Sequence, residues 1–336
     1  MAIYVASDKR YEQMAYNRVG ASGLKFPAIS LGLWHNFGFT GNYENMKAIL
    51  RTAFDAGITQ FDLANNYGPP YGSAETNAGR LLKEDFLPYR DELVITSKAG
   101  YDMWEGPYGN WGSKKYLVAS LDQSLKRLGL DYVDIFYHHR MDPETPLEET
   151  MEALAQIVRS GKALYAGISN YNEDYTRRAM EIMKELHCPL IVNQRRYSLL
   201  DRGIENDGVK EYCASHGMGI IAFSPLAQGL LTDRYLKGIP EDSRIARDGR
   251  FLKKENLTEE RLSQMRELQK MAEDRGQTLA QMALAWILRD GKVCSVLVGA
   301  SRPEQLLDNL GALKNISFTQ EELTRMDAIT VPEGDK

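Results

Sequence analysis

Residues 58–68 read ITQFDLANNYG, a short apolar run that passes directly into a polar loop. The run Ile58–Leu63 predicts a buried strand with Asp62 near its end, and Tyr67 follows in the loop. In α/β proteins, chemistry is done at the carboxyl ends of the strands and in the loops that follow them. Asp62 and Tyr67 are therefore candidate functional residues if the rest of the chain builds such a sheet.

The pattern of a short apolar strand followed by an amphipathic helix recurs along the chain. Gly57 and Gly129 stand where two of the helices are predicted to end, because glycine readily adopts the left-handed conformation of a helix C-terminus. Strands are predicted at residues 29–33, 58–63, 93–98, 132–137, 163–168, 190–193, 219–223 and 294–298. Helices are predicted at residues 44–56, 73–86, 114–128, 146–160, 174–186, 205–215, from 258, at 279–288 and from 303.

Eight such strand–helix units predict an α/β fold in which a parallel sheet closes into a (β/α)8 TIM barrel. The alternative is an open doubly wound sheet. That fold needs fewer strands and usually carries a G-x-G-x-x-G turn after the first strand, whereas residues 31–35 read LGLWH. No domain boundary or low-complexity segment interrupts the pattern, so residues 1–336 are predicted to form one barrel domain.

Three further segments carry structural expectations. Residues 16–30 predict a β-hairpin with its turn at 19–24, which we expect to plug the bottom of the barrel. Thr145–Glu148 predicts a capping box with Pro146 at the first helical position. The polar stretch 233–256 predicts a loop after the seventh strand that is long enough to indicate a functional role.

Composition narrows the class of protein. The 336 residues are 43% hydrophobic and 26% charged, with a net charge of −5, so no large basic surface for nucleic acid is expected. No apolar run approaches membrane-spanning length, and the first residues do not resemble a signal peptide. The three cysteines are scattered without a C-x-x-C motif, which favours reduced packing residues in a cytoplasmic protein. No metal site is predicted.

Closure of the barrel would bring polar side chains from three successive strand ends together. These are Asp62 and Tyr67, Lys98, and one of His138 and His139. A protonated lysine beside a phenol is expected to lower the pKa of the tyrosine, and the aspartate would neutralise and orient the lysine. Such a tyrosine can protonate a carbonyl oxygen while a cofactor supplies hydride.

Each residue also has an ordinary structural interpretation. Alone, Asp62 would be a loop cap and Tyr67 a packing residue. One of the two histidines should face the helix layer, because side chains alternate along a strand. Lys98 could instead form a Schiff base in a lyase, although a paired aspartate would keep it charged. The conjunction of these residues at successive strand ends favours the proton-donor interpretation.

The segments FDLA and YG of residues 61–68, TSK at 96–98, YVDIFYHHR at 132–140, GISN at 167–170 and GASR at 299–302 together resemble the aldo-keto reductases. The resemblance covers nearly the whole chain. It is strongest for the branch that contains the potassium-channel β-subunits and the bacterial glyceraldehyde 3-phosphate reductases. It implies a catalytic tetrad of Asp62, Tyr67, Lys98 and His139. Channel β-subunits have asparagine at the position of His139, so the histidine favours a working reductase.

The resemblance also implies NADP as the cofactor. Ser169, Asn170 and Gln194 match residues that bind the nicotinamide carboxamide, and Tyr197 matches the aromatic residue that stacks on the ring. Arg302, at a predicted helix start, suits the 2′-phosphate. The other implied contacts are Gly32 and Trp34, the pyrophosphate loop with Ser224, Pro225, Leu226, Gly229, Arg234 and Arg244, and the adenosine end with Gly299, Ser301, Gln305 and Asn309.

The substrate implied is a small aldehyde or ketone such as glyceraldehyde 3-phosphate or methylglyoxal, in a pocket lined by Trp34, Tyr101 and Trp104. Arg195 and Arg196 could attract an anionic substrate or lie in a solvated turn. The branch implies a homo-oligomer, either a tetramer or an octamer. Net charge and hydropathy predict no nucleic-acid or membrane partner. The non-enzymatic alternative is a redox-sensing subunit that binds the nucleotide with little turnover.

Overall fold

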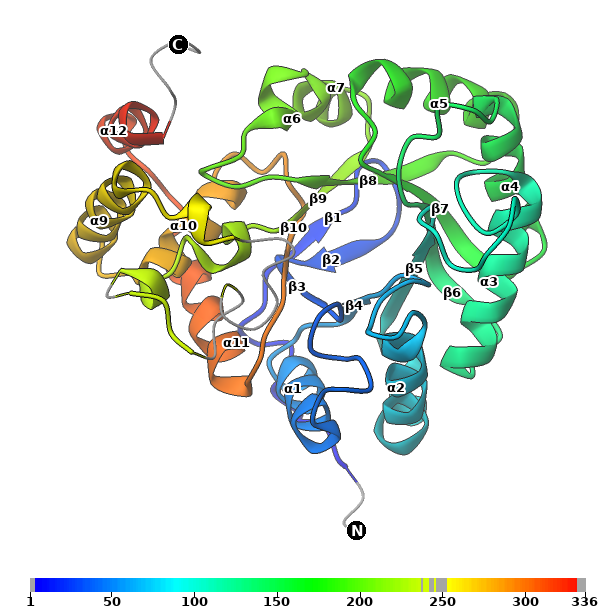
Figure 1. Ribbon diagram of the computed structural model, residues 1–336, viewed down its shortest axis with the longest axis horizontal. Helices are drawn as coiled ribbons and strands as arrows, with labels where there is room; N and C mark the ends of the chain where they lie inside the picture. The colour runs from blue at the N-terminus through cyan, green and yellow to red at the C-terminus, as the bar shows by residue number, and fades with distance from the viewer. Residues whose placement is uncertain (1–3, 237, 242–244, 246–252, 331–336) are drawn as a thin grey trace.

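The predicted barrel is confirmed. The computed structural model describes residues 4–236, 238–241, 245 and 253–330. Eight parallel strands close in the order β10-β3-β4-β5-β6-β7-β8-β9 and lie at the centre of the molecule (Figure 1). The strands are β3 Ile29–Gly32, β4 Gln60–Asp62, β5 Val94–Ala99, β6 Val133–His138, β7 Ala163–Ser169, β8 Leu190–Arg196, β9 Gly219–Phe223 and β10 Ser295–Val298.

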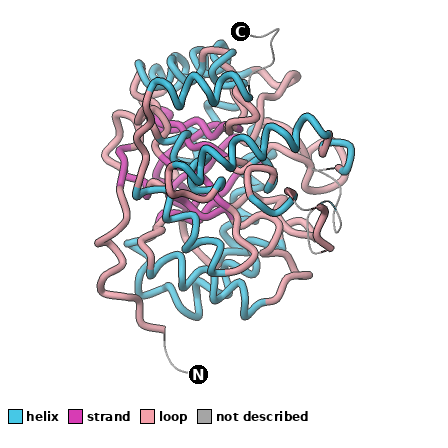
Figure 2. The backbone as a smooth tube through the Cα atoms, turned by 90° about the vertical axis from the view of Figure 1, so that its left-hand side faces the viewer, coloured by secondary structure: helices cyan, strands magenta, loops and turns pink. Residues whose placement is uncertain are grey.

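Helices surround the strands, and the tube view of Figure 2 shows the strands enclosed between them. Apolar stripes on the helices pack against the outer faces of the strands, as the helical periodicity predicts. The helices are α1 Tyr43–Asp55, α2 Ser73–Leu81 with the π-helical η1 Leu82–Phe86, α3 Lys114–Leu128, α4 Leu147–Arg159, α5 Glu173–Glu185, α6 Gly203–Asn206, α7 Val209–Ser215, α9 Glu259–Asp274, α10 Leu279–Leu288, α11 Pro303–Leu310 and α12 Gln320–Thr330.

The N-terminal hairpin plugs one end of the barrel, as expected. It pairs β1 Tyr16–Arg18 with β2 Lys25–Pro27 in antiparallel register. Val19 and Phe26 have no exposed surface and pack with side chains of the barrel interior. Gly20 has φ of 55°, and a Cβ there would lie 2.1 Å from the Gly217 carbonyl oxygen, so only glycine allows this close approach of the two backbones.

Side chains alternate along each strand between the barrel interior and the helix layer. On β9, Ile221 packs in the interior with the hairpin residues, whereas Ile220 and Ala222 belong to the outer core. The same alternation decides which strand-end residues face the open end of the barrel, here called the mouth.

Two predicted helices differ from the structure. The expected helix 205–215 is divided into α6 and α7, because Gly208 takes φ of 75° between them and the Asp207 carboxylate accepts the Val209 amide at 3.1 Å. The expected capping box at Thr145 is absent: Pro146 is the N-cap of α4 and makes no side-chain cap bond. Asp142 instead accepts the Glu144 and Thr145 amides, which orders the turn before the helix.

Helix α12 was not predicted, because its apolar face is weak. A capping box does begin it: the Thr319 amide donates to Glu322 at 2.7 Å, and the Glu322 amide donates to Thr319 Oγ1 at 3.2 Å. The sequence T-x-x-E at 319–322 is the signal that would have identified the helix start.

Cys188, Cys213 and Cys294 are all buried and free. Within the described residues, no helix is both long and apolar enough to cross a membrane. Over the same part of the chain, no group of three or more His, Cys, Asp or Glu side chains is placed to hold a metal ion.

Candidate active site

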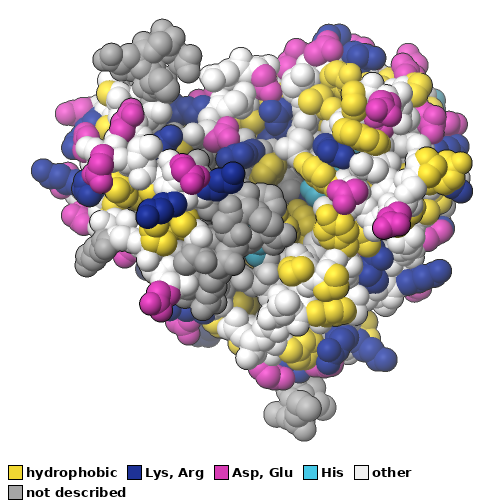
Figure 3. Space-filling view, in the orientation of Figure 1, with side chains coloured by type: hydrophobic (Ala, Val, Ile, Leu, Met, Phe, Trp, Pro, Cys, Tyr) yellow, Lys and Arg dark blue, Asp and Glu magenta, His cyan; other side chains and the backbone are white. Residues whose placement is uncertain are grey.

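The mouth of the barrel gathers the four predicted tetrad residues. Asp62 ends β4, Lys98 lies one residue before the end of β5, and His139 directly follows β6. Tyr67 follows β4 in a short loop and faces the same residues. Figure 3 shows one face of the molecule hollowed near its centre, where histidine side chains appear among hydrophobic ones.

Asp62 and Lys98 form a buried ion pair, and neither side chain has exposed surface. Lys98 Nζ lies 2.5 Å from Asp62 Oδ2 and donates to the Leu63 carbonyl oxygen at 2.7 Å. Asp62 Oδ1 accepts Thr96 Oγ1 at 2.7 Å and Gln194 Nε2 at 3.1 Å. A buried ion pair is tolerable only when its remaining polar atoms are satisfied, and these contacts satisfy most of them. Sequence reasoning missed Thr96, although it lies two residues before Lys98 and so faces inward with it.

Tyr67 lies against the charged end of this pair. Lys98 Nζ is 5.2 Å from the centroid of its ring, and the side chain is partly exposed. The expected net lowering of the pKa of Tyr67 is wrong, because burial outweighs any effect of the Lys98 charge. Burial raises the pKa of Tyr67 well above its usual value, and the negative charge of Asp62 raises it further. The phenol therefore carries its proton at neutral pH, which is the form that a proton donor requires.

His139, and not His138, is the histidine of the mouth. Its ring centroid is 5.9 Å from that of Tyr67 in an edge-to-face arrangement. Burial lowers the pKa of His139 well below its usual value, and the charge of Lys98 lowers it further, so the ring is neutral. Its buried Nδ1 has no hydrogen-bond partner within the described residues. A neutral imidazole beside the phenol can hydrogen-bond a substrate oxygen without competing for the proton of Tyr67.

A glycine sets the distance between β5 and the histidine. A Cβ on Gly100 would lie 2.9 Å from His139 Cβ and 3.1 Å from its backbone nitrogen. We expect Gly100→Ala to displace His139 and lower kcat roughly 10- to 100-fold, measured by steady-state carbonyl reduction. Gly23→Ala is the matched control, because a Cβ there meets nothing within 4 Å. Equal activity of the two variants would contradict this role for Gly100.

His138 faces the helix layer, where its Nδ1 lies 2.6 Å from Tyr171 Oη. Burial lowers the pKa of His138 to about 4, so the folded protein binds fewer protons here than the unfolded chain. The stabilisation from neutral His138 is complete above the unfolded pKa of about 6.5 and is lost as the pH falls towards 4.

We therefore expect wild-type stability to fall between pH 6.5 and 4 more steeply than that of His138→Gln, by about 3 kcal/mol over the interval. Urea unfolding at several pH values measures both slopes. The exposed His216→Gln serves as the control. If the free energy of unfolding depended on pH in the same way for His138→Gln and wild type, His138 would have the same pKa in the folded and unfolded states, and the prediction would be wrong.

The residues expected to bind the nicotinamide carboxamide lie next to the tetrad. Ser169 ends β7 and is paired with Gln194 of β8, whose backbone oxygen accepts Ser169 Oγ at 2.9 Å. Asn170 Nδ2 donates to the His139 carbonyl oxygen at 3.0 Å. Gln194 also donates to Asp62, so a hydrogen bond connects these carboxamide-binding candidates to the tetrad.

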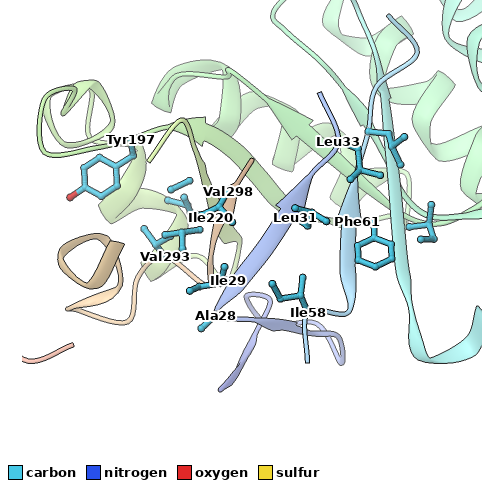
Figure 4. Close-up of a cluster of buried hydrophobic side chains, with 14 of the residues drawn as sticks. Ala28, Ile29, Leu31, Leu33, Ile58, Phe61, Tyr197, Ile220, Val293 and Val298 are labelled. Carbon is cyan, nitrogen blue, oxygen red and sulfur yellow. The ribbon is translucent and has the colours of Figure 1, made fainter. Parts of the chain in front are cut away.

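Tyr197 does not reach the mouth, contrary to the expectation that it stacks on a cofactor ring. The ring has no exposed surface, and its centroid is 5.2 Å from that of Trp286 in α10. Its hydroxyl contacts Glu205. Figure 4 shows Tyr197 in the same outer cluster as Ile220, with its oxygen pointing away from the strands. Stacking needs an accessible ring face, and Tyr197 offers none.

Phe223 is the aromatic residue at the mouth that sequence reasoning missed. It ends β9, is partly exposed, and packs against the interior cluster. Alternation along β9 is the signal that would have identified it, because Ile221 faces the interior and Phe223 stands two residues further on.

The expected pyrophosphate loop follows β9. Ser224 and Gln228 both have positive φ, of 52° and 62°, and Gly229 has φ of 98°. Left-handed residues in succession turn backbone N–H groups towards one side, which creates a concave site for anions. Pro225 and Leu226 lie within this loop, and Arg234 lies in the short helix η4 Asp233–Tyr235 that follows. Arg244 lies outside the described residues.

The expected adenosine end lies at the start of α11. Arg302 is the N-cap of this helix, is exposed, and makes no side-chain cap bond. Gln305 Oε1 accepts both the amide and the hydroxyl of Ser301, each at 2.9 Å. Asn309 is buried one turn further on, and Gly299 is exposed after β10. Gly32, at the end of β3, lies beside Leu297 of β10.

Two of the three aromatic residues expected in the substrate pocket border the tetrad directly. The ring centroid of Trp34 is 5.9 Å from that of Tyr67, and Tyr101 meets His139 edge-on at 4.7 Å. Trp104 is related to the tetrad only indirectly, through Tyr116. The ring centroids of Trp104 and Tyr116 are 5.0 Å apart, and the Tyr116 hydroxyl donates to the Tyr101 carbonyl oxygen at 2.5 Å.

Arg195 and Arg196 are both engaged with carboxylates. Arg195 extends towards the helix layer and pairs with Asp207 at 2.7 Å. Arg196 pairs with Asp201 at 2.9 Å, and its side chain is 59% exposed. The structure therefore does not favour an anion site here: the two arginines are the last residues of strand β8, and each is paired with a carboxylate of this chain.

Comparison with known proteins agrees with this geometry. The family model described as "Aldo/keto reductase family" matches residues 28–331. The chain is 58% identical over 328 residues to the L-glyceraldehyde 3-phosphate reductase of Escherichia coli O157:H7, with 97% of this chain and 95% of that protein covered. It is 37% identical over 327 residues to a Schizosaccharomyces pombe protein named as a voltage-gated potassium channel subunit beta, covering 95% and 94% of the two chains.

Among solved structures, a thermostable aldo-keto reductase in complex with the inhibitor epalrestat superimposes with a TM-score of 0.73 and 31% identity, covering 94% of this chain and 100% of that one. The extent of the family match and the identity to the bacterial reductase lead to the same assignment. The chain belongs to the aldo/keto reductase family.

Proposed function

We propose that the protein reduces small aldehydes, including phosphorylated ones, with NADPH. The observation that carries this proposal is the placement of Tyr67, protonated and partly exposed, between the buried Lys98–Asp62 pair and neutral His139. The bacterial relative named L-glyceraldehyde 3-phosphate reductase supports a phosphorylated three-carbon aldehyde as a substrate. Methylglyoxal, an unphosphorylated three-carbon aldehyde, is a second candidate.

The residues present fit a nicotinamide dinucleotide. Ser169, Asn170 and Gln194 present hydroxyl and amide groups beside the tetrad. Phe223 offers the partly exposed aromatic ring that Tyr197 lacks. The left-handed turns of the loop 224–229 suit a pyrophosphate, and the open N-terminus of α11 with Arg302 suits a ribose phosphate.

The proposed mechanism separates hydride and proton transfer. When bound beside Ser169, Asn170 and Gln194, a nicotinamide cofactor would supply the hydride for the carbonyl carbon. Tyr67 hydrogen-bonds the carbonyl oxygen and transfers its phenolic proton to it, so that the products are an alcohol and the oxidised cofactor. Lys98 stabilises the phenolate left on Tyr67, and Asp62 holds the Lys98 ammonium in place. Neutral His139 orients the carbonyl oxygen, and Trp34 and Tyr101 exclude water.

The structure does not favour the Schiff-base alternative. A nucleophilic lysine must be neutral and accessible, whereas Lys98 has no exposed surface and donates to both Asp62 and Leu63. Borohydride treatment in the presence of an aldehyde should therefore leave Lys98 unmodified.

The proposed function is tested by following NADPH oxidation with a panel of short aldehydes, each with and without a phosphate group. We expect turnover of three-carbon aldehydes and formation of the corresponding alcohol. Binding of NADPH without oxidation by any member of the panel would support the sensor alternative instead.

Preference for NADPH over NADH is proposed to depend on Arg302. Replacing it with alanine removes the cation at the start of α11, so we expect KM for NADPH to rise about tenfold while KM for NADH changes much less. Steady-state kinetics with both cofactors measure the difference. An equal rise for the two cofactors would place Arg302 outside the phosphate site.

A cytoplasmic location and a tetrameric or octameric assembly remain predictions from the sequence.

A further inference from the structure

Arg140, the residue after His139, is held rigidly beside the mouth. Its Cζ lies 4.3 Å from the ring centroid of Tyr101 and 3.7 Å from that of Trp111, so the guanidinium is clamped by two aromatic rings. Nε donates to the Gly100 carbonyl oxygen and one terminal nitrogen donates to Asn110 Oδ1, both at 2.9 Å. Rings and acceptors together orient a planar guanidinium, so little entropy is lost when it binds an anion.

In the described part of the chain, no carboxylate neutralises the charge of Arg140. Among the residues that the structure describes, none forms an ion pair with Arg140, and its hydrogen-bond acceptors are a carbonyl and an amide oxygen. The other arginines near the ends of these strands differ, because Arg195 pairs with Asp207 and Arg196 with Asp201. Arg140 is also partly exposed, so its side chain is accessible to an anion in solution.

The loop that holds the Arg140 guanidinium has an uncommon backbone conformation at one residue. Trp111 takes φ of 69°, an uncommon conformation for a bulky residue. Asn110 Oδ1 accepts the Trp111 amide at 2.8 Å as well as Arg140, so the same oxygen orders the turn and the guanidinium.

The position of Arg140 relates it to the reacting centre. The Tyr101 ring contacts both residues: it is perpendicular to the His139 ring at 4.7 Å between centroids, and Arg140 Cζ lies over it at 4.3 Å. We propose that Arg140 is the phosphate-recognition residue of the substrate site, binding the phosphate of a phosphorylated aldehyde whose carbonyl lies at Tyr67 and His139. This inference rests on the proposed function.

Substrate chemistry agrees with this arrangement. In glyceraldehyde 3-phosphate the carbonyl carbon and the phosphorus are four covalent bonds apart, so the two groups can contact neighbouring residues such as His139 and Arg140 at the same time. The loop expected to bind the cofactor pyrophosphate follows β9, and β7 and β8 separate that strand from β6, which Arg140 follows. A phosphate at Arg140 is therefore assigned to the substrate and not to the cofactor.

The test compares glyceraldehyde 3-phosphate with glyceraldehyde in wild type, Arg140→Gln and the matched control Arg196→Gln. A charge-assisted phosphate contact corresponds to a change of about 10- to 100-fold. We expect the ratio of kcat/KM for the phosphorylated to the unphosphorylated aldehyde to fall by this factor in Arg140→Gln and to be unchanged in Arg196→Gln. An Arg140→Lys variant should keep part of the preference, because the charge remains without the planar fork.

Equal losses on both aldehydes in Arg140→Gln would overturn the inference and show that Arg140 only orders the loop 100–112. A second readout does not depend on turnover: titration calorimetry of the NADPH-loaded protein with glycerol 3-phosphate and with glycerol. Tighter binding of glycerol 3-phosphate to wild type than to Arg140→Gln supports the site even if no aldehyde is reduced, and equal binding contradicts it. Absence of turnover in wild type would instead refute the proposed function.

Discussion

Replacing Tyr67 with phenylalanine is expected to lower kcat for aldehyde reduction by about 10²- to 10⁴-fold, the usual contribution of a positioned general acid. The variant keeps the ring beside Lys98 and loses only the hydroxyl that protonates the carbonyl oxygen. NADPH affinity should stay within about twofold, because none of the residues expected to hold the cofactor is altered. Steady-state kinetics and fluorescence titration with NADPH measure the two quantities separately.

Tyr101→Phe is the matched control, since it removes a hydroxyl from another ring of the same pocket and leaves the aromatic contact with His139 intact. It should retain most of the activity. Wild-type turnover by Tyr67→Phe, or an equal loss in both variants, would show that the proton comes from another group.

Replacing Lys98 with methionine is expected to destabilise the fold by about 3–5 kcal/mol as well as abolish activity. The substitution leaves the Asp62 carboxylate buried, with Thr96 and Gln194 as donors but without its counter-ion. Burying an unpaired charge carries a large desolvation cost. Urea unfolding at neutral pH measures the loss.

The double variant Asp62→Asn/Lys98→Met separates this cost from the loss of packing. Removing both charges should recover much of the stability, because a neutral amide can keep the contacts with Thr96 and Gln194. If the single variant were as stable as wild type, or the double variant no more stable than the single, the ion pair would not carry the structural role assigned to it.

The barrel was predictable because its strands are nearly continuous apolar runs of regular spacing, and closure brings the strand ends together whatever their separation in sequence. Asp62, Lys98 and one of the two histidines follow from that geometry, and the resemblance to the family selected His139 over His138. Alternation along β9 identifies Phe223. Tyr197 was expected to stack on the nicotinamide ring because of the resemblance alone, without regard to the alternation of side chains along the strands. Its ring lies buried in the outer core.

Properties that depend on three-dimensional packing were not accessible from the sequence. The neighbouring Lys98 suggested a lowered pKa for Tyr67, but burial and the negative charge of Asp62 give a net shift of the pKa upwards. The pairing of Arg195 with Asp207 depends on the turn that divides α6 from α7. The clamp around Arg140 requires the loop 100–112 to fold back over β6, and no local pattern indicates this.

The central claim is that this site transfers hydride from NADPH and the proton from Tyr67 to a small aldehyde. A single-turnover experiment tests it most directly: the NADPH-loaded protein is mixed rapidly with glyceraldehyde 3-phosphate while cofactor absorbance and the alcohol product are followed. We expect stoichiometric loss of NADPH with one equivalent of glycerol 3-phosphate in wild type, and none on the same timescale in Tyr67→Phe. NADPH that stays bound and reduced in wild type, or equal rates in the two proteins, would contradict it.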